Sequence, residues 1–315
     1  MCLLVSCGLE TARPSKKQEL VIASDFLNKN DLLLFRSFEE QYGVTVRLKS
    51  MSADSIHKHL KLHGYASHID LVFLQSSLDF CDLEADNLLH TLKRQDLLAQ
   101  IPKKYQGKNG SWFGLSIDPY VVVYKKDTNT LIQNYKDLLR RPVWTTNLRE
   151  GQQLDAFYAG LMFRGRNNSG QSLKLIEGFE AKKTILKKSI DSLFNYPPLL
   201  TSYSAFYSDT SVMRTRYRKL KLIFPNQKYG GTLYELRAIG LVKQASNYSN
   251  ALEFILYLVK EENNQRINNW WNTFPVGNTL DRSFEYQNQR FKLYSEAPRR
   301  WCKQHKKAKQ ITEKK

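Results

Sequence analysis

The first hundred residues alternate between short apolar runs and segments with helical periodicity. Apolar runs of strand length occupy 20–23, 44–48 and 69–74. The third run is unbroken, which is typical of a strand covered on both faces. Between the runs, over 31–42 and 52–64, apolar residues recur at helical spacing. Strands and helices in this order predict right-handed crossovers and an α/β fold with a parallel, doubly wound sheet.

Both helical segments carry the expected terminal residues. Asn30 precedes the first segment and Ser52 begins the second, and either side chain can cap a helix N-terminus. Gly43 and Gly64 follow the segments and suit the residue just past a helix C-terminus.

Polar side chains follow two of the predicted strands, at the point where each strand ends. Ser24 and Asp25 follow the first strand, and Gln75 and Ser76 follow the third. In doubly wound sheets, ligands bind outside the carboxyl ends of the strands. We therefore expect these four side chains to form one wall of a binding site. Capping or packing is the alternative for each of them.

Composition sets the class of protein. A chain of 315 residues is long enough for two domains, each with its own core. Its 42% hydrophobic and 12% aromatic content excludes a disordered protein. No run of about 18 apolar residues occurs, so we predict a globular protein that does not span a membrane.

Of the net charge of +18, the last eighteen residues carry +7, and the other +11 is spread over the remaining 297 residues. The last eighteen residues hold eight Lys or Arg residues and one Glu, and a second basic cluster, RTRYRKLK, occupies 214–221. We interpret these clusters as a solvated basic surface with a frayed C-terminal tail. A site for nucleic acid or an anionic membrane at 214–221 and 299–309 is the alternative.

The cysteines show neither a metal-binding nor a redox pattern. They are Cys2, Cys7, Cys81 and Cys302. No pair has CxxC spacing, and four are too few for a disulfide framework.

The segment LVSC, followed by Gly8, resembles a bacterial lipobox, and residues 8–18 read as a polar tether. We therefore predict that Cys7 is lipidated. The six residues before it are too few for a signal, so this interpretation requires a start upstream. An ordinary N-terminal tail is the alternative.

No motif indicates catalysis. No Ser-His-Asp, Cys-His or paired-carboxylate arrangement can be assembled, and there is no Gly-rich phosphate loop. His59 and His63 have the i, i+4 spacing of metal ligands, but no acidic or cysteine partner follows nearby. We predict no enzyme activity, no cofactor and no metal site.

Five stretches have an order and spacing that resemble a known family. They are LVIASDF, EEQYGVTV, IDLVFLQSS, NGSWFGLSIDPYVVVYKKD, and GGTLYELRAIGLVKQASNYSNALEFILYLVKEENNQ with FPVGNTL after it. Together they resemble the extracellular solute-binding proteins of ABC importers, in the ferric-iron-binding branch of the type II periplasmic binding protein fold. The resemblance spans roughly residues 18 to 285.

The resemblance implies two doubly wound lobes joined by crossing hinge strands, one near 121–124 and the other near 233–238. The implied segments are an N-terminal tether (1–18), lobe one (19–117 with 238–285), lobe two (118–237) and a basic C-terminal segment (286–315).

The ligand positions depart from the iron-binding relatives. There, the first strand ends near a histidine, the third ends near a glutamate, and a lobe-two helix starts with paired tyrosines. The matching residues here are Phe26, Gln75 and the pair Tyr203 and Ser204. Ferric iron prefers several anionic oxygen donors. Even with Tyr207 one turn after Tyr203, this set is a poor iron site, so we predict that the iron site is lost.

The far wall is predicted from lobe two. Asp118 and Tyr120 lie where some relatives have anion-binding arginines. Glu150 and Gln152 belong to EGQQ, which opens a helix whose N-terminal amides favour a polar group. The predicted residues of this wall are Asp118, Tyr120, Glu150, Gln152, Tyr203 and Tyr207. For Glu150 and Tyr207, capping or packing is the stronger alternative.

The sequence therefore predicts the solute-binding component of an ABC importer. We expect a monomer that captures a small polar solute by hinge closure and delivers it to an ABC permease. We expect it in the periplasm or at the cell surface, held to the membrane by a lipid on Cys7, and not bound to nucleic acid. A polyanion-binding protein and a sensor or adaptor that reuses the scaffold are the alternatives.

Overall fold

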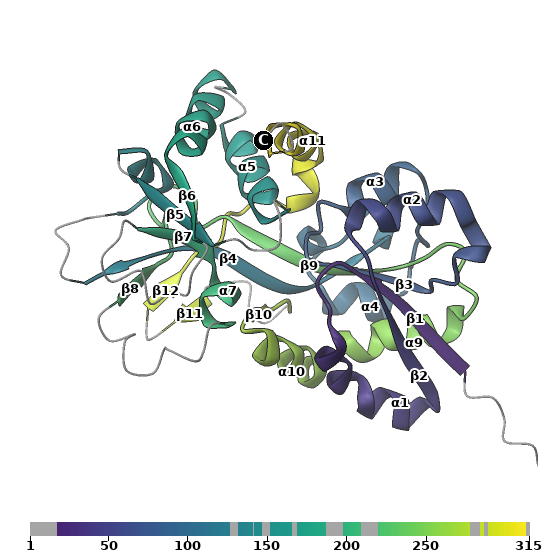
Figure 1. Ribbon diagram of the computed structural model, residues 1–315. Helices are drawn as coiled ribbons and strands as arrows, with labels where there is room; N and C mark the ends of the chain where they lie inside the picture. Colours follow the sequence, from purple (N-terminus) through teal and green to yellow (C-terminus); the bar gives the residue numbers. More distant parts are fainter. Residues whose placement is uncertain are drawn as a thin grey trace, which may run out of the picture.

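The computed structural model describes residues 18–126, 132–140, 142–146, 152–165, 169–186, 198–208, 220–277, 284–286 and 289–312. They form two α/β lobes joined by long shared strands, which is the predicted fold class (Figure 1). The strands are β1 (Gln18–Ser24), β2 (Val44–Ser50), β3 (Leu71–Leu74), β4 (Phe113–Lys125), β5 (Val143–Thr146), β6 (Lys183–Leu186), β7 (Leu199–Ser202), β8 (Leu220–Ile223), β9 (Tyr234–Leu241), β10 (Phe274–Pro275), β11 (Phe284–Tyr286) and β12 (Gln289–Phe291). The helices are α1 (Arg36–Tyr42), α2 (Ala53–His63), α3 (Phe80–Ala85), α4 (Gln95–Gln100), α5 (Gln152–Arg164), α6 (Ser169–Lys182), α7 (Tyr203–Ser208), α9 (Tyr248–Val259), α10 (Glu261–Trp271) and α11 (Cys302–Thr312).

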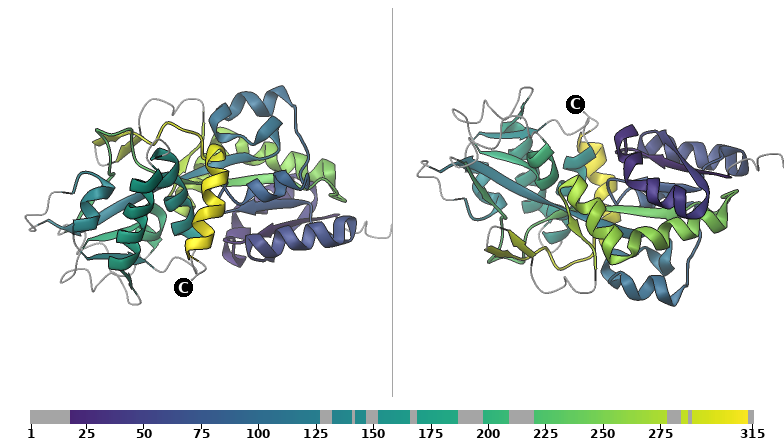
Figure 2. Two further views of the ribbon diagram at one scale, coloured as in Figure 1. Left: turned by 90° about the horizontal axis from the view of Figure 1, so that it is seen from above. Right: turned by 90° about the horizontal axis from the view of Figure 1, so that it is seen from below.

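Lobe one is built on the strand order β2-β1-β3-β9. As predicted, β1 pairs in parallel with both β2 and β3. Helices α2 and α3 cover one face of this sheet, and α1 and α9 cover the other (Figure 1). All four residues of β3 are buried, because helices lie on both sides of its apolar run. Figure 2 shows the two lobes from above and below.

The predicted helix over 31–42 is α-helical only in its second half. Residues Lys29–Phe35 form a 3-10 helix, and α1 follows it. The cap is Asn28 and not Asn30: the Asn28 side chain accepts a hydrogen bond from the Asn30 N–H, and the Asp31 side chain accepts one from the Asn28 N–H. This reciprocal capping box fixes the start two residues earlier than the apolar pattern indicates.

The other predicted helix ends are correct. Gly43 follows α1 with φ of 67°, the left-handed conformation that glycine adopts without strain. Ser52 caps α2 by accepting a hydrogen bond of 3.2 Å from the Ser55 N–H, and Gly64 ends that helix.

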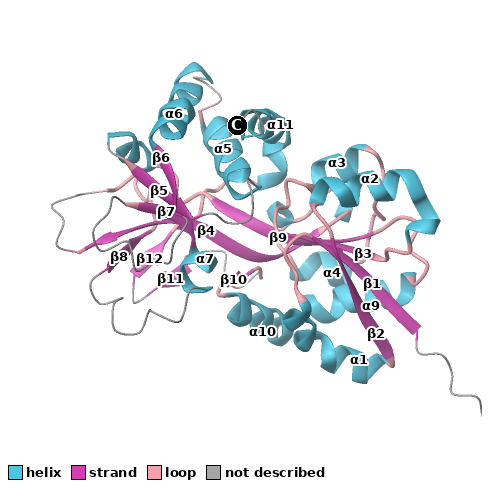
Figure 3. Cartoon of the chain, in the orientation of Figure 1, coloured by secondary structure: helices cyan, strands magenta, loops and turns pink. Residues whose placement is uncertain are grey.

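Two long strands cross between the lobes. Strand β4 pairs antiparallel with β9 over 113–119, and from Tyr120 onward it pairs with β7 and β8 of lobe two. Strand β9 continues into lobe one, where it pairs with β3 (Figure 3). The predicted crossing segments therefore lie on these strands. Since each strand belongs to both lobes, the exact lobe boundaries stay predictions.

Lobe two packs its helices on a sheet in which β5 lies parallel to β6 and β7. Helices α5 and α6 cover this sheet, and Phe157 of α5 lies in the lobe-two core. Within the described part of the chain, no helix has the length and apolar character needed to cross a membrane.

The C-terminal segment is ordered and is not the frayed tail that we predicted. Helix α11 packs against α5, and both Trp301 and Ala308 are buried in the lobe-two core. Figure 2 shows α11, in yellow, at the boundary between the lobes. The expectation failed because the many lysines conceal a one-sided helix, in which Trp301, His305 and Ala308 are buried at helical spacing.

A disulfide ties this segment to lobe one. Cys302 is bonded to Cys81 of α3, with 5.8 Å between the Cα atoms. The cysteine count and spacing argue against a disulfide framework, and they do not predict this single bond. The two residues are 221 positions apart, and spacing of that length carries no pairing signal. We call residues 298–312 the strap, because they join the core of lobe two to lobe one.

Ion pairs reinforce the strap. Lys309 Nζ lies 3.0 Å from a carboxylate oxygen of Asp54 and 3.0 Å from one of Asp79, and Lys306 Nζ lies 3.0 Å from Asp82. Burial works against the charge of Lys309, but Asp79 and Asp54 outweigh it and raise the pKa of Lys309. Two lysines of the proposed polyanion site at 299–309, Lys306 and Lys309, are thus already paired with carboxylates of lobe one. Residues 214–219 of the other basic cluster lie outside the described residues.

We predict that breaking the disulfide destabilises the protein. The bond closes a loop of more than two hundred residues, so Cys302→Ser should lower the free energy of unfolding by about 2–4 kcal/mol. Urea unfolding followed by tryptophan fluorescence measures this. Reductant should shift the wild-type transition toward that of Cys302→Ser and leave the variant unchanged. An equal response of both proteins to reductant would show that this bond does not form.

Candidate functional site

The predicted serines of the first wall cap their own turns. Ser24 is fully buried, and its Oγ accepts hydrogen bonds from the N–H groups of Phe26 and Leu27 at 3.3 and 3.1 Å. Ser76 is buried in the same way, and its Oγ accepts from the Leu78 N–H at 3.3 Å. The capping alternative therefore describes both hydroxyls.

Asp25 and Gln75 bring the two strand ends together. Asp25 Oδ1 accepts a hydrogen bond of 2.9 Å from the backbone N–H of Gln75. The Gln75 side chain continues the contact, because its Nε2 donates to Glu235 Oε2 at 3.3 Å. The ends of β1 and β3 thus meet at one edge of the sheet and contact hinge strand β9.

Asp118 connects hinge strand β4 to lobe two. This buried carboxylate accepts hydrogen bonds from the backbone N–H of Ser204, at 2.9 Å, and from the Ser204 hydroxyl. Arg237 Nη2 donates to Ser204 Oγ at 3.0 Å and lies 3.4 Å from Asp118 Oδ2. Ser204 lies in the first turn of α7, so a lobe-two helix is fixed to both crossing strands.

Sequence reasoning missed Glu235 and Arg237. They are two residues apart on β9 and therefore face the same side of the sheet. On β4, Asp118 lies opposite Glu235 and Ser116 lies opposite Arg237. The signal was available in the sequence YELRAIGL, because two charged residues inside an otherwise apolar strand must find partners.

The hinge carries two buried carboxyl groups and one guanidinium. Burial raises the pKa of Glu235, and the opposing Asp118 raises it further. Burial also raises the pKa of Asp118, although Arg237 and Ser204 oppose this change. Because the Arg237 guanidinium is 3.4 Å from Asp118, Asp118 is the better stabilised anion. Glu235 consequently retains its proton to a higher pH than an exposed glutamate would.

Aromatic rings enclose the Arg237 guanidinium. Its Cζ lies 5.1 Å from the ring centroid of Phe26 and 5.6 Å from that of Trp271. Both distances allow cation–π attraction. Phe26 also packs edge-on against Phe73 of β3, with 5.2 Å between the centroids. Lobe one therefore covers the hinge cation directly.

Tyr203 and Tyr207 form an aromatic cluster on α7. Their ring centroids are 4.6 Å apart, and the Tyr203 ring lies 4.9 Å from that of Phe274. Both tyrosines are partly buried. Tyr203 and Ser204 are consecutive, so this cluster lies directly beside the polar contacts of Ser204.

The remaining predicted residues lie elsewhere. Tyr120 is buried in the lobe-two core, where its ring packs against Phe157 with 5.2 Å between the centroids. Packing therefore describes Tyr120 better than ligand contact. Gln152 begins α5, but its side chain is outside what the structure describes. Glu150 and Cys7 also lie outside the described residues.

Several buried polar atoms at the hinge make no hydrogen bond with the described residues. They are Ser77 Oγ, Ser116 Oγ and Arg237 Nε. All three belong to the same region, because the Ser77 N–H donates to the Leu236 carbonyl and Ser116 lies opposite Arg237. Buried polar atoms without partners are unfavourable and uncommon. The hinge therefore holds donors and acceptors that a bound molecule could satisfy.

The described residues bring no cluster of metal ligands together. No group of three or more His, Cys, Asp or Glu side chains that could hold a metal occurs among the described residues. The ring centroids of His59 and His63 are 4.5 Å apart, and His59 Nε2 lies 3.4 Å from the Ser67 carbonyl oxygen. This pair therefore gains no third ligand of these types.

Comparisons with known proteins identify the fold. No family model matches the chain. Iron uptake protein A1 of Synechocystis sp. is 22% identical over 287 residues, which is 82% of this chain and 77% of that protein. The structure of the ferric binding protein from Campylobacter jejuni is 20% identical, covers 94% of this chain and 98% of its own, and has a TM-score of 0.80. The apo ferric ion-binding protein A of Pasteurella haemolytica is 18% identical, covers 94% and 97%, and has a TM-score of 0.79.

The chain therefore has the two-lobed fold of the type II periplasmic binding proteins, as the sequence resemblance predicted. Within that fold, the structures to which it is similar include ferric-ion-binding proteins.

We predict that Asp25 gives the stability a specific pH dependence. Burial and the negative charge of Asp79 raise the pKa of Asp25 to about 7, whereas an aspartate in an unfolded chain titrates near ~3.9. The folded protein therefore binds this proton more tightly. The contribution of Asp25 to stability is fully present below about pH 4 and is lost as the pH rises through about 7.

Asp25→Asn should remove this loss, which is on the order of 2–4 kcal/mol between mildly acidic and mildly alkaline pH. Urea unfolding at both pH values measures it. Asp96→Asn is the control, because Arg94 lowers the pKa of Asp96 and its titration lies below this window. The prediction fails if Asp25→Asn loses as much stability with rising pH as the wild type.

Proposed function

We propose that this protein is the solute-binding component of an ABC importer. It captures a small polar solute between its lobes by hinge closure. The observation that carries the proposal is one set of buried and partly buried polar contacts that includes lobe one, both crossing strands and lobe two. Its members are Asp25, Gln75, Asp118, Ser204, Glu235 and Arg237.

This arrangement supports closure that depends on a solute. A ligand shifts the equilibrium between open and closed lobes only if it contacts the closed form better. Gln75 follows β3 of lobe one and Tyr203 begins α7 of lobe two, so a solute that touches both gains contacts only when the lobes are closed. In this structure the lobes lie against each other, because Leu78 of lobe one packs in the lobe-two core.

We propose further that iron is not the solute, although relatives are named for iron. The position that matches a histidine ligand is Phe26, whose ring lies over the Arg237 guanidinium. The second tyrosine position is Ser204, which is hydrogen-bonded to Asp118. Ferric iron needs several anionic oxygen donors, and a fixed guanidinium beside those positions repels a trivalent cation.

The side chains favour a small polar organic molecule. The Gln75 amide, the Asp25 carboxyl group and the unpartnered atoms of Ser77 and Ser116 supply hydrogen-bonding groups. The Tyr203 ring supplies an adjacent apolar face. Rings with a few fixed polar groups are typical of sites for such ligands.

The disulfide supports a location outside the cytoplasm, because disulfides persist in oxidising compartments. We propose the periplasm or the cell surface, with Cys7 lipidated. A chain extended upstream of Met1 should then partition with membranes in a bacterial host, and Cys7→Ser should release it. Equal membrane association of the two forms would exclude the lipid anchor.

The direct test is native mass spectrometry of protein exported to a bacterial periplasm. We expect a co-purified small organic molecule. Gln75→Ala leaves a solute group without its hydrogen bond and should weaken binding by about 1–3 kcal/mol, and Tyr203→Ala should weaken it by removing the opposite wall. Gln95→Ala and Tyr65→Ala, at exposed positions, are the matched controls and should retain the molecule.

Two outcomes would contradict the proposal. Unchanged retention in both Gln75→Ala and Tyr203→Ala would place the site elsewhere. A stoichiometric visible iron–tyrosinate band on addition of ferric citrate, abolished by Tyr203→Phe, would show that the iron site is retained.

A further inference from the structure

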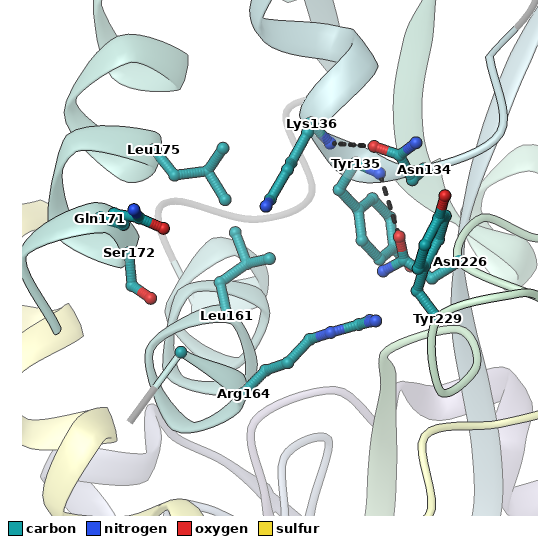
Figure 4. Close-up of a pocket in the computed structure, with 11 residues that line it drawn as sticks. Asn134, Tyr135, Lys136, Leu161, Arg164, Gln171, Ser172, Leu175, Asn226 and Tyr229 are labelled. Atoms are coloured by element: carbon teal, nitrogen blue, oxygen red, sulfur yellow. Dashed lines mark hydrogen bonds between the residues drawn. The ribbon is translucent and has the colours of Figure 1, made fainter. Parts of the chain in front are cut away.

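Lobe two contains a pocket that is separate from the hinge contacts. Its volume is about 420 Å³, which lies in the range of small-molecule sites. It is bounded by α5, by α6, by the 3-10 helix Tyr135–Arg140 and by the turn that contains Asn226 and Tyr229 (Figure 4). None of the residues that line it is among the six that form the polar contacts at the hinge (Asp25, Gln75, Asp118, Ser204, Glu235 and Arg237).

Two cations line the pocket, and no described residue supplies a counterion to either of them. Arg164 is half-buried, and its Nη1 is buried without a hydrogen bond. Its guanidinium lies near the ring of Tyr294, with 5.7 Å from Cζ to the ring centroid. Lys136 lines the same space, and no carboxylate of the described residues pairs with either side chain.

An unpaired, partly desolvated guanidinium is unfavourable, and burial lowers the pKa of Arg164. By contrast, the buried guanidinium of Arg237 is paired with Asp118. The described lining of this pocket contains no Asp or Glu side chain at all. The described residues of the pocket therefore supply no negative charge to balance its two cations.

Apolar groups complete the lining. Leu161 of α5 and Leu175 of α6 lie beside the end of the Lys136 side chain in Figure 4, and the Tyr135 ring lies next to the Asn226 side chain, above the end of Arg164 in this view. The Tyr135 hydroxyl already donates a hydrogen bond of 2.9 Å to the Tyr120 carbonyl. Its contribution to the pocket is therefore the apolar ring. The pocket combines positive charge with apolar walls.

We infer that this pocket binds a small organic anion. A carboxylate or phosphate group pairs with Arg164 and Lys136, and a short apolar or aromatic body contacts Leu161, Leu175 and the ring of Tyr135. Charge-assisted hydrogen bonds from a guanidinium to anionic oxygens are among the strongest in proteins. The site lies within one lobe, so it is independent of the importer function and of hinge closure.

The test uses the full chain and isothermal titration calorimetry at constant ionic strength, with phenyl phosphate, benzoate and neutral benzyl alcohol as probes. The two anions distinguish a phosphate site from a carboxylate site. At least one anion should bind stoichiometrically, and benzyl alcohol should bind at least about tenfold more weakly. Arg164→Gln and Lys136→Gln should each weaken the anion by about tenfold. Lys174→Gln, an exposed lysine on α6 that does not line the pocket, should leave affinity unchanged.

Thermal unfolding separates this role from a structural one. Without ligand, Arg164→Gln should melt no lower than the wild type, because it removes an unpaired charge. Lys136 is exposed, so Lys136→Gln provides an independent folded variant. The inference is overturned if neither anion binds at millimolar concentration, if benzyl alcohol binds as well as the anions, or if Lys174→Gln weakens binding as much as the pocket variants.

Discussion

The pairing of β4 with β9 is the constraint on which the rest of the structure depends. Both strands run through both lobes and are buried along nearly their whole length, so any charge that they carry must be paired inside the protein. Asp118, Glu235 and Arg237 place three such groups where the lobes meet. Gln75 of lobe one donates a hydrogen bond to Glu235, and Ser204 of lobe two accepts one from Arg237. Residues of both lobes therefore contact the crossing strands, because the buried charges there need partners. The same residues form the candidate solute site.

The strap adds a second connection with a different physical character. Trp301 holds it to the lobe-two core by packing, whereas Cys302 holds it to lobe one by a covalent bond. Thermal motion can separate packed side chains but cannot break a disulfide. We therefore expect lobe opening to move α11 with α3 and to separate it from α5. The contacts of Lys309 with Asp54 and Asp79 would then travel with lobe one.

The parts of the site that follow from regular geometry could be predicted from the sequence. Parallel strands place their carboxyl ends at one edge, which is why Asp25 and Gln75 meet. Whether a hydroxyl such as that of Ser24 faces a ligand or caps its own turn depends on local backbone conformation, which polarity alone does not specify. Arg237 was missed because its partners come from distant segments, and Cys302 was missed because a pairing over so long a separation leaves no pattern.

Small-angle X-ray scattering tests most directly the central claim, that a solute closes the two lobes about their crossing strands. Protein freed of its co-purified molecule by partial unfolding and refolding should be measured before and after that molecule is added back. The account predicts a smaller radius of gyration in the reloaded protein, with the decrease abolished by Tyr203→Ala. Tight rebinding with identical scattering before and after would contradict it.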